Sequence, residues 1–170
     1  MVLLNNITLI QTSVAALLVI GGVVAKNSSQ QLELTDKTVE YIGTAMFVGG
    51  WLLSAYVLSY GKENKYLYIL PCFGVLIAVM IMKMEIKKFK FLSMILPGLF
   101  IISWILIGYN VGNHIPSSLK YSGLMASALV IVSMMKALPY QRLHNNVDGP
   151  GTYLFMLAWL IIILLNSMSK

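Results

Sequence analysis

Apolar stretches close to the length of a membrane crossing follow one another along nearly the whole chain. A helix needs about 20 apolar residues to cross the hydrocarbon core of a bilayer. Short segments rich in charged residues and turn formers separate the stretches. The pattern predicts an all-α protein with helices at residues 2–25, 41–60, 66–82, 91–109, 121–138 and 152–168.

The balance of apolar and charged residues excludes an ordinary soluble domain. Hydrophobic residues make up 58% of the chain and charged residues only 11%, whereas soluble domains carry about 25% charged residues. Lipid solvates apolar side chains directly, and within it a helix satisfies its own backbone hydrogen bonds. We therefore expect one polytopic integral membrane bundle of six transmembrane helices over residues 1–170, with the lipid bilayer as its surroundings.

Basic residues in the predicted loops indicate the orientation, because cytoplasmic loops carry an excess of Lys and Arg. The first, third and fifth loops, with the helix ends beside them, hold Lys26, Lys37, Lys83, Lys87, Lys88, Lys90, Lys136 and Arg142. The other side holds half as many, at Lys62, Lys65, Lys120 and Lys170. Both termini are therefore expected on the non-cytoplasmic side. The count of basic residues does not identify the membrane.

A weak self-match suggests a repeat of three helices. Shifting the chain by about 87 positions, a register that would insert the second copy upside down, places residues 18–21 on 105–108 and residues 66–70 on 153–157. Chance explains such matches between apolar segments equally well, and Ile69-Leu70-Pro71 also matches Ile95-Leu96-Pro97 at a different period. The 3+3 inverted repeat is one hypothesis, and no repeat is the other.

Ionisable residues are missing from the predicted helix centres, where they would mark a proton relay or an ion path. Lys136 lies nearest to one, but its long side chain can reach the interface. His114 and His144 fall on opposite sides of the predicted membrane, and Cys72 is the only cysteine. We expect no enzyme activity, no cofactor and no metal, and the scattered bases of a chain with net charge +6 do not predict nucleic-acid binding.

Uncharged polar residues gather in the first predicted helix. Asn5, Thr8 and Thr12 share a helical face at spacings of three and four, with Gln11 beside them. One interpretation is a polar path for a solute along this helix. The other is hydrogen bonding between helices, with each bond contributing less than about 2 kcal/mol.

Two predicted loops could contact lipid or partners. The third loop contains Lys83, Lys87, Lys88 and Lys90 beside apolar residues, a pattern typical of anionic-lipid binding and equally of simple topology signalling. The fifth loop contains Arg142 and His144, as a docking surface or as an ordinary solvated loop.

Aromatic residues occupy two kinds of position. Most tyrosines, including Tyr68, fall at predicted helix ends, where their rings suit the headgroup level. Trp51, Trp104 and Trp159 instead fall within helices, which favours core packing between helices over a ligand-lining role. Asn110 is expected to begin the fourth loop.

Two functional interpretations remain. The leading one is a non-enzymatic structural or accessory component that packs beside other subunits in a larger membrane assembly, such as an organelle complex or the membrane of a large virus particle. The alternative is a small-solute transporter or a membrane substrate-binding subunit, supported by the 3+3 repeat and the polar first helix.

Overall fold

A computed structural model describes the backbone of residues 6–31, 37–83, 90–113, 115, 119, 121–143 and 150–168. Within these residues the chain is entirely helical, with six helices and no strand. The helices are α1 (Asn6–Gln31), α2 (Lys37–Ser59), α3 (Tyr66–Lys83), α4 (Lys90–Gly112), α5 (Ser122–Leu143) and α6 (Pro150–Met168). The predicted all-α class and the order of the six helices are confirmed.

Two helices extend well past the ends predicted from their apolar stretches. Helix α1 continues to Gln31 instead of ending near residue 25, and α5 continues to Leu143 through a segment that was expected to be loop. The added segments contain Lys, Gln and Arg, which have good helix propensity although they are polar. Apolarity marks the part of a helix suited to lipid, and the helix itself can continue beyond that part.

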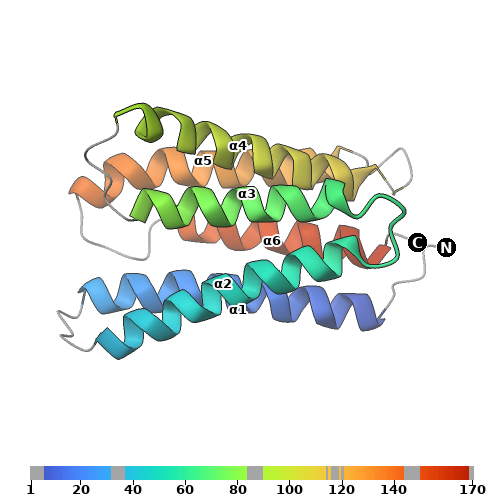
Figure 1. The fold of residues 1–170 in the computed structure, drawn as a ribbon, viewed down its shortest axis with the longest axis horizontal. Coiled ribbons are helices and arrows are strands. Elements are labelled where there is room, and N and C mark those ends of the chain that lie inside the picture. Colours follow the sequence, from blue (N-terminus) through green and yellow to red (C-terminus); the bar gives the residue numbers. More distant parts are fainter. Residues whose placement is uncertain are drawn as a thin grey trace.

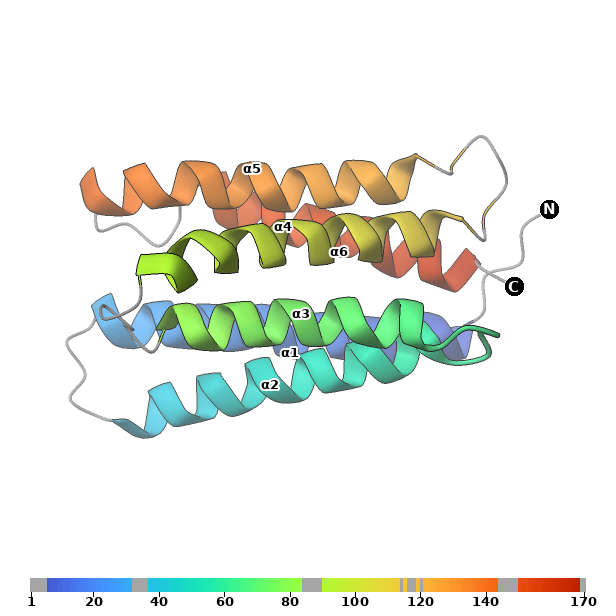
Figure 2. The ribbon, with the colours of Figure 1, turned by 45° about the horizontal axis from the view of Figure 1, so that its top comes forward.

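The helices lie side by side along one axis (Figures 1 and 2), and their contacts form a closed ring. Each helix packs against the next in sequence, and α6 returns to pack against α1. Because successive helices run in opposite directions, α2, α4 and α6 are parallel to one another. Helix α1 begins and α6 ends at the same end of the bundle (Figure 1), which we call the N/C end.

Three helices are long and apolar enough to cross a membrane. These candidate spans are Ile7–Ala25, Tyr41–Ser59 and Ile95–Gly112. The apolar parts of the other helices are shorter, at Tyr66–Ile81, Ser122–Ser133 and Tyr153–Met168 among the described residues. The fold is therefore compatible with a membrane location, and the described residues supply three candidate spans by length and composition.

Glycines allow two pairs of neighbouring helices to approach closely. A Cβ atom on Gly50 of α2 would meet the backbone nitrogen of Val19 on α1 at 2.6 Å. A Cβ on Gly108 of α4 would meet the backbone of Gly123 on α5, and the reverse also holds. Small residues at such contacts let helix backbones approach and increase van der Waals contact.

Candidate functional site

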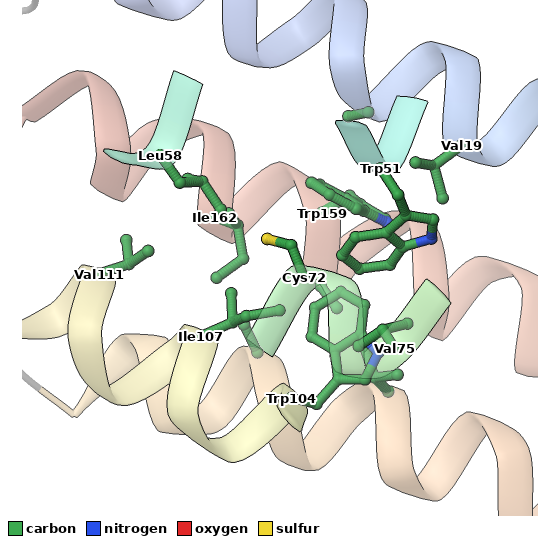
Figure 3. Packing of buried hydrophobic residues seen from close by; sticks show 14 of the residues in the cluster. Val19, Trp51, Leu58, Cys72, Val75, Trp104, Ile107, Val111, Trp159 and Ile162 are labelled. Carbon is green, nitrogen blue, oxygen red and sulfur yellow. The ribbon is translucent and has the colours of Figure 1, made fainter. Parts of the chain in front are cut away.

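Three tryptophans meet at the centre of the ring, and we call them the tryptophan cluster. Trp51 comes from α2, Trp104 from α4 and Trp159 from α6 (Figure 3). Their ring centroids lie 5.5 Å (Trp51 to Trp104), 5.5 Å (Trp51 to Trp159) and 5.7 Å (Trp104 to Trp159) apart. All three side chains are at most 2% exposed. The cluster fills the space that a central path between these helices would need.

A phenylalanine stands four residues before each of these tryptophans. Phe47, Phe100 and Phe155 occupy these positions on α2, α4 and α6. Phe47 and Phe100 contact the tryptophan of their own helix, and Phe155 contacts Trp104 edge to face at 6.2 Å. The recurring Phe-x-x-x-Trp pattern is readable in the sequence and marks the three tryptophan positions as equivalent, although the sequence predictions above do not use it. The shift of 87 positions pairs Trp104 with Leu17 and therefore does not relate the tryptophans to one another.

The indole N–H groups of the cluster are buried without hydrogen bonds. Nε1 of Trp51, Trp104 and Trp159 has no partner within the described structure. A buried donor without a partner costs about 1–3 kcal/mol. The edge-to-face geometry of Trp104 against its two neighbours, at 79° and 80°, supplies favourable ring contacts that offset part of this cost.

Buried polar side chains form a second feature nearer the N/C end, which we call the polar layer: Thr12, Tyr68, Asn110 and Asn166. The first of its two contacts joins α1 to α6. Asn166 Nδ2 donates to Thr12 Oγ1 at 2.9 Å, and Thr12 Oγ1 donates to the Thr8 carbonyl at 2.7 Å. This contact closes the ring between the first and last helices with a buried hydrogen bond.

The second contact of the polar layer joins α3 to α4. Tyr68 donates its hydroxyl to the Asn110 carbonyl at 3.1 Å, and Asn110 Nδ2 donates to the Leu67 carbonyl at 2.6 Å. Asn110 is therefore a buried helical residue, and its expected place in a loop was wrong because α4 continues to Gly112. Tyr68, expected at the headgroup level, is only 3% exposed.

The predicted polar stripe on the first helix is divided by the fold. Thr12 faces inward to Asn166, Thr8 is half-buried, and Gln11 is exposed on the outer side of α1. Asn5 lies outside the described residues. The described members of the stripe therefore do not share one environment.

The predicted contact residues of the third and fifth loops lie at or beyond helix ends. Lys83 ends α3, Lys90 begins α4, and Arg142 lies in the last turn of α5, although the structure describes none of these side chains. Lys87, Lys88 and His144 lie outside the described residues. Their roles stay predictions.

The turn between α2 and α3 carries a partly buried cation at the N/C end. Gly61 adopts φ +70° there, a left-handed conformation that glycine reaches at little cost. Lys62 Nζ lies 5.9 Å from the centroid of the Tyr68 ring, within the range of a cation–π contact. Burial lowers the pKa of Lys62 below its ordinary value, because the charged form loses water.

Comparison with protein-family models, curated proteins and solved structures gives no match to this chain. The class of the protein therefore follows from its own fold. It is a helical bundle with three helices able to cross a membrane, an aromatic centre and buried polar contacts between helices. The described residues hold no group of His, Cys, Asp and Glu that could bind a metal ion.

Proposed function

We propose that the chain is a non-enzymatic multi-pass membrane protein in which all six helices cross the bilayer, and that it serves as a structural or accessory component of a larger membrane assembly. The observation that carries this proposal is the tryptophan cluster. Its rings occupy the centre of the helical ring, where a solute path between α2, α4 and α6 would run.

The polar side chains support the same proposal. Thr12, Tyr68 and Asn110 bond to atoms of neighbouring helices, as side chains do when they fix helix packing. Ser127 adds a further bond between helices, donating to the Trp104 carbonyl at 2.5 Å. These groups hold the helices to one another and leave the outer surface for lipid and partner subunits.

The proposal is tested by purification in mild detergent and by thermal unfolding against a panel of small metabolites. We expect defined membrane subunits to copurify, and no metabolite to raise the melting temperature. Changing Asn5 and Gln11 together to Leu should alter stability only modestly and should not abolish the assembly. A reproducible metabolite shift that this double substitution removes would contradict the proposal, since a ligand of the folded state raises apparent stability.

The tryptophan N–H groups favour one second candidate, a small-solute transporter or substrate-binding subunit. These three buried donors have no partner among the described residues, and a solute that carries hydrogen-bond acceptors would pair with them. Changing the three tryptophans to Phe, singly and in pairs, removes N–H donors while keeping aromatic rings. A solute-dependent melting shift that is lost stepwise in these variants would favour the transporter.

The proposed orientation places both termini on the non-cytoplasmic side and the third loop next to cytoplasmic lipid. A cysteine introduced at Ser29, in the Cys72→Ala background, should stay unlabelled by an impermeant thiol reagent in sealed cells. Labelling from outside would reverse the orientation.

Anionic vesicles should bind the purified protein less well once Lys87 and Lys88 are changed to Gln.

A further inference from the structure

The outer face of α1 is a continuous exposed strip with one polar residue in it. Ile7, Ile10, Val14 and Leu17 are 69%, 62%, 44% and 66% exposed, and Gln11 is exposed between them. Ile7, Gln11 and Val14 follow one another at intervals of four and three residues, with Ile10 and Leu17 beside them. This heptad spacing is the one that lets two helices pack along a shared seam.

Gln11 lies one helical turn inside the N-terminal end of the candidate span Ile7–Ala25. At about 1.5 Å per residue it is roughly 8 Å from the middle of that span. A carboxamide facing hydrocarbon loses its hydrogen bonds to water and gains none from lipid. Apolar residues surround it on this face, so an unoccupied face would leave the amide unsatisfied in the bilayer.

Helix α1 is also the least enclosed of the three candidate spans. Only 28% of its span is buried within the bundle, against 50% for each of the spans in α2 and α4. Its inner side already makes the contacts to Gly50 and Asn166. Among the described residues, no other helix therefore covers the outer side of α1.

We propose that this face binds a second copy of the chain, so that α1 packs in parallel against α1 about a twofold axis along the membrane normal. A carboxamide is both donor and acceptor, so two Gln11 side chains can satisfy each other. Copies inserted in the same orientation bring Gln11 to the same depth on both sides, as an isologous contact requires. The pairing rests on the proposed membrane function. It identifies a second copy of the chain as one partner in the proposed assembly.

Disulfide cross-linking in native membranes tests the pairing. In the full chain with Cys72→Ala, which removes its only cysteine, Val14→Cys reports on the α1 face. Leu164→Cys is the matched control, because it is 43% exposed on α6. Val14 lies two residues after Thr12, and Leu164 lies two residues before Asn166. Because Thr12 and Asn166 are bonded to each other, the two introduced cysteines lie at a similar depth along the bundle.

Oxidation should convert Val14→Cys into a covalent dimer and leave Leu164→Cys monomeric. Equal cross-linking of both variants, no dimer at Val14, or a product joined to a different protein would each overturn the pairing. Such a failure leaves the proposed function standing, because copurification and the metabolite screen test that function without using this face.

The role of the carboxamide is tested by the dissociation constant of the dimer in lipid or detergent. Gln11→Leu should weaken the dimer roughly 3- to 10-fold, the range expected for a hydrogen bond between membrane helices. Gln11→Asn retains the amide and should recover part of that loss. An unchanged constant in Gln11→Leu would overturn the Gln11 contact, and folding is not at risk because the side chain is exposed.

Discussion

The tryptophan cluster at the bundle centre and the polar layer nearer the N/C end are both buried, yet different interactions hold them. At the centre, Trp51, Trp104 and Trp159 make contact through ring faces and edges, with their N–H groups unpaired. Toward the N/C end, Thr12 and Asn110 take part in hydrogen bonds between helices. Close packing of rings therefore holds the tryptophan cluster together, and hydrogen bonds between helices hold the polar layer together.

The difference predicts unequal costs of mutation in the two regions. Removing a large ring from a packed centre forfeits many dispersion contacts and leaves a cavity. Removing one hydrogen bond between membrane helices costs less, because the unfolded chain in lipid also finds partners for its polar groups.

Trp104→Ala should produce the largest loss of stability. The Trp104 side chain is 0% exposed and contacts both other members of the cluster, so truncation should lower the unfolding free energy by about 3–5 kcal/mol. Ile105→Ala on the next residue, which is 41% exposed, is the control and should cost far less. Equal losses in reversible detergent unfolding would show that the centre is not tightly packed.

Gly108→Ala should be the next most damaging change, because Gly108 lies at the close approach of α4 and α5, between Trp104 and Asn110 on α4. Its new Cβ would collide with the Gly123 backbone, which cannot move as a flexible side chain can. We expect the unfolding free energy to fall by about 1–3 kcal/mol. Gly49→Ala is the control, since nothing lies within 4 Å of its Cβ position, and it should be neutral or stabilising by up to about 1 kcal/mol. A stabilising Gly108→Ala would contradict the close α4–α5 contact.

The Thr12–Asn166 bond should contribute less than either packing feature. A double-mutant cycle with Thr12→Val and Asn166→Leu isolates the interaction between the two side chains. We expect a coupling energy of about 0.6 kcal/mol, and at most roughly 1.7 kcal/mol. A coupling near zero would mean that α1 and α6 are held together by apolar contact alone.

Lys62 should give the smallest effect, visible as a dependence of stability on pH. Burial lowers the pKa of Lys62 in the folded state, so the unfolded state binds more protons between that lowered pKa and the ordinary value of 10.5. Stability should therefore rise with pH across this window and should rise less in Lys62→Met. Melting curves of both proteins at pH 8 and pH 10.5 provide the measurement, and identical slopes would contradict the buried position of Lys62.

Much of the fold could be predicted because apolar length carries most of the information about a membrane helix. Each of the six predicted segments overlaps an observed helix. The ends of α1 and α5 were less predictable, since polar residues with good helix propensity continue a helix beyond its apolar part. The ring closure by Thr12 and Asn166 was not predictable, because one sequence does not show which distant helices become neighbours.

The candidate site was predicted only in part. Core packing was the favoured interpretation for Trp51, Trp104 and Trp159, and the structure places all three in one cluster. Their equivalence could have been read from the Phe-x-x-x-Trp pattern. The polar stripe divided because Gln11 and Thr12 are adjacent in sequence, and neighbouring residues on a helix point about 100° apart. The Tyr68–Asn110 contact depends on the register between α3 and α4, which the sequence does not state.

Labelling of Cys72 in the unmodified protein tests the central claim most directly. Cys72 lies beside the tryptophan cluster (Figure 3) and is 1% exposed, so a small water-soluble methanethiosulfonate reagent reports whether water reaches the bundle centre. A centre packed by the cluster predicts no labelling of the native protein in membranes and complete labelling after unfolding in detergent. Rapid labelling of the native protein would show a wet path through the centre and would contradict the packed structural bundle.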